Sequence, residues 1–287
     1  MSVLLHLSDT HFGTEQPEVV EAVVALAAQL RPEVVVLSGD ITQRARPAQF
    51  RAAKAFLDRL GAPSLVIPGN HDIALFDLWA RLARPYGRYA TVFGADLEPV
   101  YTSPDWLVIG LNTTRARRHK HGEVSDRQIA RVSQLLAAAQ PEQLRVVVVH
   151  QPAAVPHASE RANLLRGHAN ATRRWAEAGA DLVLGGHIHL PFTLALGGLA
   201  RRLCVVQAGT AVSSRTRADV PNSVNVLRWH PEGAAVGQSA LAAAQARAPA
   251  QCLIEQWDYA CEQRTFVRTQ LTAVAPERHP DGGTSRR

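Results

Sequence analysis

Five short apolar runs, each followed by residues that can bind a metal, constrain this 287-residue chain more than any other feature. The runs are Val3 to Leu7, Val34 to Leu37, Leu65 to Ile67, Val146 to Val149 and Leu182 to Leu184. Branched apolar residues bounded by Gly, Pro and Asp are typical of buried strands. The segments that follow are Ser8-Asp9-Thr10-His11, Gly39-Asp40, Gly69-Asn70-His71-Asp72, His150 and Gly186-His187-Ile188-His189. Ligands of open α/β sheets bind beyond the carboxyl ends of the strands, so we expect these side chains to share one edge.

Helical patterns separate the first three runs. Pro17 to Leu30 has apolar residues at helical spacing behind a proline that suits a helix start. Pro47 to Leu60 repeats the pattern and ends at Gly61. Strand, helix, strand, helix and strand in this order imply a parallel sheet with right-handed crossovers. Later segments predict a strand over Trp106 to Leu111 and helices over Ile73 to Ala83, Leu164 to Ala178 and from a Ser125 cap to Ala139.

The pattern changes to short strands after Pro191. We expect them at Phe192 to Leu196, Arg202 to Gln207, Ser223 to Trp229, Ala234 to Ala242 and Val267 to Leu271. Gly197-Gly198 and Pro231-Glu232-Gly233 suit hairpin loops. These patterns predict an α/β fold in which two sheets pack face to face with helices outside. We expect a single domain over residues 1–274 and a disordered tail over residues 275–287.

The composition limits the kind of partner. A net charge of +6 and a pI of about 9.8 suit an anionic substrate, a nucleic acid or a membrane surface. The arginines are spread along the chain, which favours a solubilising role. No stretch approaches the ~18 apolar residues of a membrane span, and His6 and Asp9 interrupt the first run, so we expect no signal peptide. Three cysteines without a CxxC pair favour a reducing, cytoplasmic location, with a Cys252–Cys261 bridge as the alternative.

The candidate metal ligands combine imidazoles, carboxylates and an amide: Asp9, His11, Asp40, Asn70, His150, His187 and His189. This mixture suits Mn, Fe, Zn or Co. The set is too large for one ion with open positions, but it suits two ions that share a carboxylate. Asp40 is the natural bridge because its strand is the central one of the first three. Taken singly, Gly-Asp is common at turns and His150 could be an ordinary strand-end histidine; the conjunction favours a metal site.

Together, Asp9-x-His11, Gly39-Asp40, Gly69-Asn70-His71-Asp72, His150 and Gly186-His187-x-His189 resemble the signature of the calcineurin-like metallophosphoesterases. The resemblance covers roughly Val3 to Gly209. Leu7 to Phe12, Gly122-Glu123-Val124-Ser125 and Gly209-Thr210 are most similar to the bacterial class III cyclic-nucleotide phosphodiesterases and their glycerophosphodiesterase relatives. The resemblance implies a four-layer α-β-β-α sandwich. It also implies one ion bound by Asp9, His11, Asp40 and His189, and another bound by Asp40, Asn70, His150 and His187.

The resemblance places the chemistry at these two ions. Two metals ~3.5–4 Å apart can hold a bridging hydroxide and clamp both oxygens of an in-line displacement. Asp9, Asp40 and hydroxide leave two divalent ions with net positive charge, which attracts a phosphodiester. We expect His71 to act as general acid or to stabilise developing charge, oriented by Asp72. The family often has a second histidine after the strand-end one, where this chain has Gln151-Pro152; this puts one substrate contact in doubt.

The substrate side depends on loops. Asn70, His71, Arg115 and His121 are the candidate substrate contacts; a solvated charged loop over Arg115 to His121 is the alternative for the last two. The best substrate is a small diester of the 3′,5′-cyclic nucleotide (cAMP) type. A glycerophosphodiester, a phosphomonoester or a nucleotide-linked lipid precursor is the alternative, and homodimer formation stays open. The basic pI supports a nuclease only weakly. The sequence has no strongly amphipathic basic helix, so we do not favour a role at the membrane surface. A non-catalytic scaffold on this fold would be missing metal ligands, whereas all seven are present here.

Overall fold

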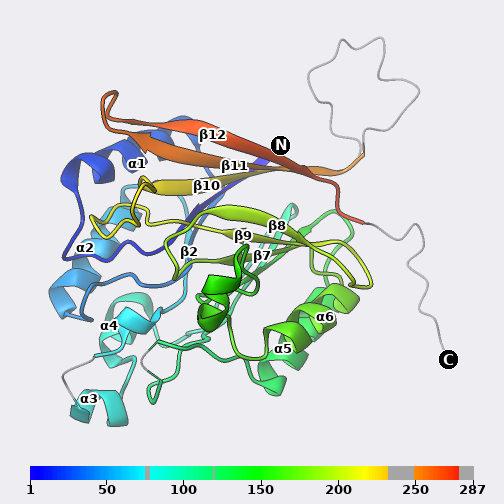
Figure 1. The fold of residues 1–287 in the computed structure, drawn as a ribbon, viewed down its shortest axis with the longest axis horizontal. Coiled ribbons are helices and arrows are strands. Elements are labelled where there is room, and N and C mark those ends of the chain that lie inside the picture. Colours follow the sequence, from blue (N-terminus) through cyan, green and yellow to red (C-terminus); the bar gives the residue numbers. More distant parts are fainter. Residues whose placement is uncertain (75–77, 119, 232–248, 278–287) are drawn as a thin grey trace.

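The computed structural model describes residues 1–74, 78–118, 120–231 and 249–277. Two six-stranded sheets lie face to face, with helices on their outer sides (Figure 1). The first sheet has the order β12-β11-β10-β1-β2-β3 and the second has the order β4-β5-β6-β7-β9-β8. This arrangement confirms the four-layer α/β sandwich that the sequence pattern and the family resemblance implied.

The first sheet consists of β1 (Ser2–Leu7), β2 (Val34–Leu37), β3 (Ser64–Val66), β10 (Ser223–His230), β11 (Gln251–Ala260) and β12 (Thr265–Val274). β1, β2 and β3 run parallel, and β10, β11 and β12 extend the sheet with antiparallel pairs. The second sheet consists of β4 (Val100–Thr102), β5 (Trp106–Gly110), β6 (Leu144–Val148), β7 (Leu182–Gly185), β8 (Phe192–Leu196) and β9 (Leu203–Gln207). In this sheet β5, β6, β7 and β9 are parallel, while β4 and β8 are antiparallel edges.

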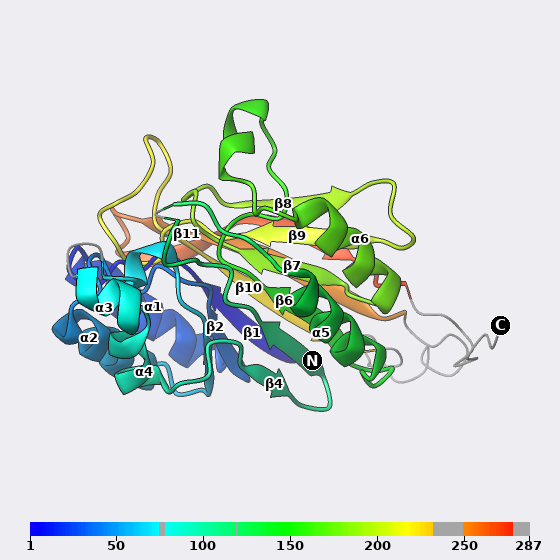
Figure 2. The same cartoon turned by 90° about the horizontal axis from the view of Figure 1, so that it is seen from below.

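The helices cover the two outer faces. They are α1 (Pro17–Leu30), α2 (Pro47–Asp58), α3 (Leu78–Ala83), α4 (Gly87–Phe93), α5 (Asp126–Ala137) and α6 (His168–Ala178), with short 3₁₀ turns η1 (Asn70–Asp72) and η2 (Ala158–Asn163). In Figure 2, α1 and α2 lie at one end of the sandwich and α5 and α6 at the other. Ser125 caps α5 as expected, since its side chain accepts from the Gln128 amide.

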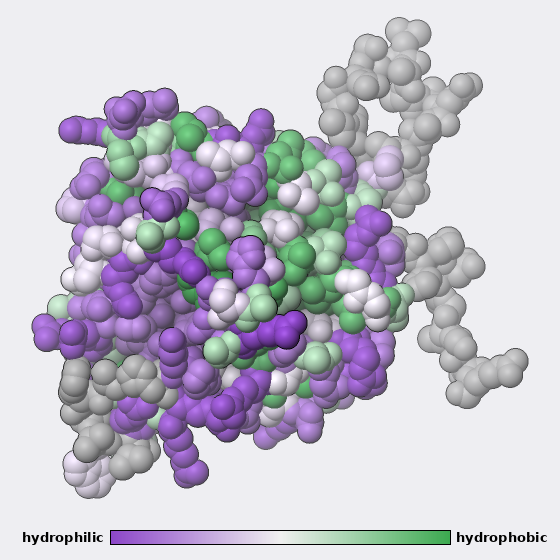
Figure 3. All heavy atoms as spheres, viewed as in Figure 1, coloured by the Kyte–Doolittle hydropathy of each residue, from purple (hydrophilic) through white to green (hydrophobic). Residues whose placement is uncertain are grey.

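Three apolar clusters explain why the strands read as continuous apolar runs. Val34 and Val36 point into the cluster between the two sheets, while Val35 and Leu37 join the cluster beneath α1, α2 and α4. A third cluster lies between the second sheet and helices α5 and α6. A parallel strand that is buried on both faces needs apolar residues at successive positions. Figure 3 shows hydrophobic residues gathered around the edge strand β8, flanked by hydrophilic areas.

Several predicted boundaries were wrong. The helix expected over Ile73 to Ala83 does not include Ile73, whose backbone is extended after η1; its described part is α3, Leu78–Ala83. The helix expected from Leu164 begins at His168, after Gly167 takes a positive φ of 84°. β4, α4 and β11 were not predicted. The expected strand over Ala234 to Ala242, and part of the hairpin loop before it, lie outside the described residues.

The expected disordered tail is only partly described. The Glu277 carbonyl accepts a hydrogen bond from Arg201 at 2.7 Å, and its carboxylate accepts one from the Arg202 amide at 3.1 Å. Glu277, three residues beyond β12, is therefore anchored to the loop before β9. Residues 278–287 lie outside the described part. Among the described helices, none has the length and apolar character that crossing a membrane requires.

Candidate metal centre

The seven predicted ligands come together at the edge where the parallel strands of both sheets end. Three groups of acidic and histidine side chains have their ligand atoms within 4.8 Å of one another: Asp9, His11 and His189; His11, Asp40 and His71; and Asp40, His150 and His187. Four of the seven follow β1, β2 and β3 of the first sheet, and the other three follow β6 and β7 of the second. The site therefore spans the interface between the sheets.

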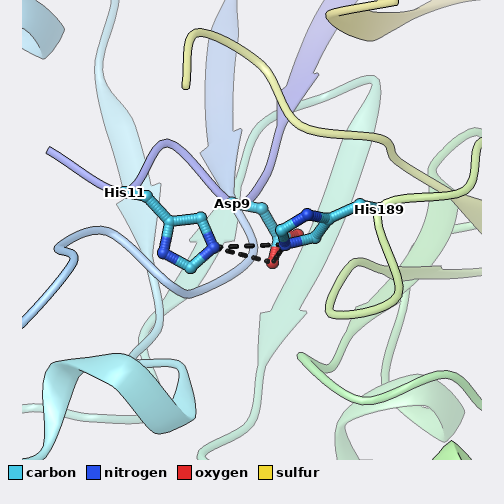
Figure 4. Close-up of side chains that lie close together, drawn as sticks. All are labelled: Asp9, His11 and His189. Atoms are coloured by element: carbon cyan, nitrogen blue, oxygen red, sulfur yellow. Dashed lines mark hydrogen bonds and ion pairs between the residues drawn. The ribbon is translucent and has the colours of Figure 1, made fainter. Parts of the chain in front are cut away.

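Asp9, His11 and His189 form one end of this centre (Figure 4). The Nε2 atoms of His11 and His189 face each other at 3.1 Å. Asp9 Oδ1 lies 3.2 Å from His189 Nε2 and 3.8 Å from His11 Nε2. Two ring nitrogens and a carboxylate oxygen thus converge on one point, which is the arrangement that a cation with nitrogen and oxygen ligands requires.

Asp40, Asn70, His150 and His187 form the other end. His150 Nε2 lies 3.2 Å from the Asn70 amide oxygen and 3.3 Å from Asp40 Oδ1. The second oxygen of Asp40, Oδ2, lies 3.8 Å from His11 Nε2 in the first group. The two oxygens of Asp40 therefore face different groups, as a bridging carboxylate would.

Backbone strain is concentrated at these ligands. The described residues other than glycine with positive φ are Asp9, His11, Arg31, Asp40, Ala45, His187, His189, Asp219 and Arg264. Five of these nine are candidate ligands, with φ between 42° for His11 and 75° for His187. The left-handed region costs a non-glycine residue on the order of 1–3 kcal/mol and persists where the surrounding structure imposes it. The surrounding fold thus holds the ligand-bearing turns in backbone conformations that are unfavourable for isolated non-glycine residues.

Two glycines allow the turns to approach each other closely. A Cβ atom on Gly186 would lie 1.9 Å from Ser8 Oγ and 2.4 Å from Asp9 Oδ2. A Cβ atom on Gly69 would lie 2.0 Å from the Asp40 backbone nitrogen and 2.2 Å from its Oδ1. Distances this short exclude any side chain. These glycines precede His187 and Asn70, so the close approach brings ligands from different strands together.

Hydrogen bonds on the far sides of the rings orient the imidazoles. His150 Nδ1 donates to the Ser38 carbonyl at 2.8 Å, and His189 Nδ1 donates to the Arg215 carbonyl at 2.6 Å. A carbonyl oxygen accepts only, so each bond places a proton on Nδ1 and directs the Nε2 lone pair into the centre. Asp9 Oδ2 accepts from the His187 amide at 2.9 Å, which leaves Oδ1 to face the two histidines.

Two carboxylates and two imidazoles of the set already have the charge state of metal ligands. Burial alone would raise the pKa of Asp9 and Asp40, but His189 beside Asp9 and His150 beside Asp40 hold both pKa values below the ordinary range. Burial lowers the pKa of His11 to about 3 and that of His187 to about 4. The carboxylates are therefore ionised and these two rings neutral, which is the form that binds a cation. Burial opposes protonation of His150 as well, yet Asp40 outweighs it and raises the pKa to about 9.

Unpaired buried atoms provide a direct test of whether metal ions fit. Among the described side chains, His187 Nδ1 and Asp9 Oδ1 are buried without a hydrogen-bond partner of acceptable geometry. Buried polar atoms are nearly always paired, so orphaned atoms need a reason. Both atoms belong to residues of the groups described above. A pair of cations would satisfy both atoms, so the residues present fit the metals that the sequence implied.

His71 and Asp72 lie beside the centre, but not in the arrangement expected. The His71 ring donates from Nδ1 to the Gln43 carbonyl at 3.0 Å. The Asp72 carboxylate accepts from the Ile41 and Thr42 amides at 3.0 and 2.9 Å. No described hydrogen bond joins the Asp72 carboxylate to the His71 ring, so the predicted orientation of His71 by Asp72 is not a direct one. Asp72 instead fixes the turn after Asp40 that carries the Gln43 carbonyl.

The pKa of Asp72 differs from that of the two carboxylate ligands. Burial, and then the charge of Asp40, raise the pKa of Asp72 to about 6, against the hydrogen bonds it accepts. The side chain is 1% exposed. Asp72 is thus a buried residue that holds the turn after Asp40 in place, and it does not line the pocket.

A pocket of about 410 Å³ opens over the centre. Its lining consists of Asp40, Asn70, His71, Lys120, Glu160, Asn163, His187, Ile188, His189, Arg215 and Arg217. The lining includes Asn70 and His71, as predicted, but neither Arg115 nor His121. Arg115 is turned towards the start of α5, where it donates to Gln128 at 3.0 Å and to the Asn112 carbonyl at 3.2 Å. His121 is exposed, and Lys120 is the pocket-lining member among the described residues of the basic loop.

Sequence reasoning missed the arginines of the pocket. Arg215 and Arg217 lie in the loop between β9 and β10, and Glu160 and Asn163 lie in or beside η2. Figure 2 shows the green segment with η2 and the yellow loop after β9 at the same edge of the molecule. The strand pattern could have indicated this loop. β9 is parallel to β7, so its carboxyl end, and the loop that follows it, lie at the edge of the sheet where the candidate ligands meet.

Gln151 takes the place of the second histidine. It is fully buried, its amide oxygen accepts from Thr113 Oγ1 at 2.7 Å, and it fills the space beside Gly122. It does not line the pocket. The doubtful substrate contact is therefore not made by Gln151, which instead joins the loops after β5 and β6.

Comparison with known proteins agrees with this geometry. A protein of Rhodococcus erythropolis named "Probable cyclic nucleotide phosphodiesterase" is 28% identical over 214 residues, which is 68% of this chain and 67% of that protein. A Mycobacterium tuberculosis protein named as a cAMP/cGMP dual specificity phosphodiesterase is 27% identical over 252 residues, covering 80% of this chain and 76% of the other.

A solved structure and a family model complete the comparison. The fold is shared with a dimetal phosphatase from Danio rerio at a TM-score of 0.64 and 11% identity, covering 96% of this chain and 99% of the other. The model of the calcineurin-like phosphoesterases matches residues 2–191, which include all seven candidate ligands. The chain therefore belongs to the calcineurin-like phosphoesterase family, and it is a metallophosphoesterase.

Proposed function

We propose that this chain is a dinuclear metallophosphodiesterase that hydrolyses small phosphodiesters, with 3′,5′-cyclic nucleotides of the cAMP type as its substrate class. The observation that carries the proposal is the placement of Asp40. Its two carboxylate oxygens face two separate ligand groups at the floor of one pocket. Paired ligand groups with a shared carboxylate are the arrangement used for in-line displacement at phosphorus.

The residues divide between two ions as follows. Asp9, His11, Asp40 and His189 hold one, and Asp40, Asn70, His150 and His187 hold the other. Mn, Fe, Zn and Co all accept this mixture of nitrogen and oxygen ligands. When bound, the pair supplies Lewis-acid activation of water and of the phosphoryl oxygens. The chain keeps the carboxylates ionised and directs the imidazole lone pairs inward. Through Asp40, it also fixes the distance between the two ligand groups.

His71 and Asn70 are the proposed substrate contacts beside the ligands. Both line the pocket, and the His71 amide donates to Asp40 Oδ1 at 2.8 Å, which ties the His71 backbone to that carboxylate. The Gln43 carbonyl fixes the proton on Nδ1 and leaves Nε2 directed towards the pocket side. We propose that His71 stabilises the negative charge that develops on the phosphoryl group or on the leaving oxygen.

The substrate class is supported by pocket size, charge and relatives. A volume of about 410 Å³ lies within the range of ~300–1,000 Å³ that small ligands occupy. Lys120, Arg215 and Arg217 give the lining a positive character that suits a phosphate. The two relatives described above carry cyclic-nucleotide names. The free thiols of Cys204, Cys252 and Cys261 support a reducing compartment, and we propose the cytoplasm.

The test is a substrate panel with manganese-loaded protein. It contains bis-p-nitrophenyl phosphate, p-nitrophenyl phosphate, 3′,5′-cyclic AMP, 2′,3′-cyclic AMP and glycerophosphocholine. We expect the largest kcat/KM among the natural compounds for 3′,5′-cyclic AMP. Asp40→Asn should lose at least ~100-fold on every substrate, because even residues that only support a ligand cost 10–100-fold.

The pattern of the panel separates the alternatives. A preference for glycerophosphocholine or for the monoester would keep the metal site and overturn the cyclic-nucleotide assignment. Equal activity of wild type and Asp40→Asn would overturn the metal mechanism itself. Metal analysis of both proteins by mass spectrometry accompanies the assay, so that a folding defect in the variant is recognised.

A further inference from the structure

Arg215 is the pocket residue whose contacts neither the ligand set nor the family signature explains. Its Nη1 donates to Gln43 Oε1 at 2.9 Å and to His71 Nε2 at 3.3 Å. The same atom lies 3.4 Å from His11 Nδ1. We propose that Arg215 is a further cation of the active site, which binds a non-bridging oxygen of the phosphoryl group and is held in place by Gln43 and His71. This inference rests on the proposed function.

The loop that carries Arg215 is pinned to the first sheet. The Ala211 amide donates to the Ser8 carbonyl at 3.0 Å, and the Ser214 amide donates to the Thr14 carbonyl at 2.9 Å. Ser213 Oγ meets Thr14 Oγ1 at 2.8 Å and accepts from the Arg215 amide at 3.0 Å. The side chain therefore starts from a fixed point beside the turn after β1. A preorganised donor loses little entropy when it binds an oxygen.

The guanidinium keeps donors available for a ligand. Within the described chain, the hydrogen bonds of the Arg215 side chain are all made by Nη1, so no described residue uses Nη2 or Nε. His11 in its metal-binding form carries its proton on Nδ1, so it offers Arg215 no acceptor. A guanidinium presents its N–H groups as a planar fork that matches two oxygens of a phosphate. Since Arg215 lines the pocket, this fork can face the phosphoryl group.

The charges of the lining distinguish Arg215 from Arg217. Arg217 is bound to Glu160 at 2.9 Å and donates to the Ile188 carbonyl at 3.4 Å. Arg118, in the basic loop, is bound to Glu123 at 3.1 Å. Arg215 has no carboxylate partner among the described residues and bonds only neutral acceptors. A half-buried cation without a counter-charge is satisfied when an anion enters the pocket.

The same contacts refine the role of His71. Its Nδ1 proton is committed to the Gln43 carbonyl, so Nε2 is the acceptor for Arg215. A ring that accepts from a guanidinium at Nε2 has no second proton to deliver from that atom. His71 is therefore a positioning residue that acts through Arg215, and its effect is on the charge of the phosphoryl group and not on the leaving group.

The first experiment measures binding of inorganic phosphate to manganese-loaded protein by isothermal titration calorimetry. The proteins are wild type, Arg215→Ala, Arg215→Lys and Arg59→Ala. Arg59 pairs with Glu21 on the exposed surface and serves as a control for the loss of one positive charge. We expect Arg215→Ala to weaken phosphate about 10-fold to 100-fold, which is the range for hydrogen bonds to charged groups. Arg215→Lys should recover part of the loss, and Arg59→Ala should match wild type.

The second experiment separates the side chain from the metals. His189 uses the backbone carbonyl of Arg215, which Arg215→Ala retains, so the manganese content should equal that of wild type. Added guanidinium at millimolar concentration should restore part of the kcat/KM of Arg215→Ala on bis-p-nitrophenyl phosphate. The losses in His71→Ala and Arg215→Ala should be less than additive in the double variant.

Three results would overturn the proposal: unchanged phosphate binding in Arg215→Ala, loss of manganese from that variant, or additive losses with His71→Ala. Failure of the proposed function gives a different result, because wild type itself would then neither bind phosphate nor hydrolyse the diester. Wild-type turnover together with unchanged binding in Arg215→Ala rejects the role of Arg215 alone.

Discussion

At the scale of single residues, Asp40 and His150 form a buried pair whose protonation must change when a metal binds. Asp40 raises the pKa of His150 to about 9 despite its burial, so the ring is protonated at neutral pH in metal-free protein. A metal accepts only the deprotonated ring, and binding must displace this proton. The apparent affinity should therefore rise up to about tenfold per pH unit between pH 6.5 and 8.5.

Calorimetry of Mn²⁺ binding in two buffers of different ionisation enthalpy checks this, because it counts the protons released at each pH. His150→Ala should release fewer protons than wild type. An affinity that stays constant from pH 6.5 to 8.5 would show that His150 is already neutral before the metal arrives.

The residues that could be predicted from sequence are those that follow an apolar run directly. Asp9, Asp40 and His150 sit one turn beyond buried strands, so strand ends located them without any knowledge of side-chain direction. Arg215 lies eight positions beyond β9 in a loop without periodicity, and only the three-dimensional path of that loop brings it to His71. The different partners of Asp72 and His71 could not be predicted either, since neighbours in sequence can point in different directions within one turn.

At the scale of elements, the turn after β1 and the turn after β7 can approach each other closely only because residue 186 is a glycine. A methyl group there would overlap Ser8 Oγ and Asp9 Oδ2, which lie in the buried turn after β1. We expect Gly186→Ala to destabilise the protein by about 1–3 kcal/mol, as overpacking does. It should also weaken metal binding, because Asp9 must move.

Urea unfolding and manganese titration of Gly186→Ala measure the two effects. The matched control is Gly197→Ala in the loop between β8 and β9, where a Cβ atom has no neighbour within 4 Å. Equal stability and equal metal affinity in the two variants would contradict the close-packing argument.

Strand β11 was missed because of a buried carboxylate in its middle. Glu255 is 2% exposed and accepts from Arg228 on β10 at 3.1 Å and from Arg268 on β12 at 3.0 Å. A glutamate inside a strand breaks the apolar pattern that marks strands. The partners that make its burial possible come from neighbouring strands, so sequence order alone does not reveal them.

The same carboxylate should make stability depend on pH. Burial alone would raise the pKa of Glu255, but hydrogen bonds from Trp257, Arg228 and Arg268 outweigh it and lower the pKa. A lowered pKa stabilises the fold above the unfolded value of about 4.5, and this stabilisation is lost as pH falls through the folded value. We expect Glu255→Gln to cost about 1–3 kcal/mol at pH 7 and progressively less below pH 4.5.

Chemical unfolding of wild type and Glu255→Gln from pH 7 down to pH 3.5 gives the difference directly. Glu21→Gln is a suitable control, since Glu21 is exposed on α1 and pairs with Arg59 at the surface. A difference that grows as the pH falls would have the wrong sign for this explanation.

At the scale of the whole molecule, the ligands are shared between the two sheets. Asp9, His11, Asp40 and Asn70 follow strands of the first sheet, and His150, His187 and His189 follow strands of the second. Metal binding should therefore stabilise the packing of one sheet on the other. Free metal at 100 times its Kd adds about 2.7 kcal/mol of stability.

Thermal unfolding with EDTA and with increasing Mn²⁺ measures this coupling. We expect the melting temperature to fall with the chelator and to rise with the logarithm of free Mn²⁺. Asp40→Asn should show a much smaller response. A melting temperature that is independent of metal would mean that the sheets hold the site without help from the ions.

The layered architecture was predictable as a whole because strands buried on both faces require cover on both sides. Val34 to Leu37 has no polar face, so it could only lie inside a sandwich. The size of the pocket was not predictable, since it depends on Glu160 and Arg217 joining two loops that are 57 positions apart.

The left-handed turns at Asp9, His11, Asp40, His187 and His189 have a consequence for how such a chain can change. Glycine adopts that conformation without penalty, so exchanging any of the five for glycine would remove local strain while abolishing a ligand. The local strain at these five residues is thus retained together with the side chains that bind the stabilising ions. A duplicate copy that exchanged them for glycine would lose its turnover and also the rise in melting temperature that Mn²⁺ produces.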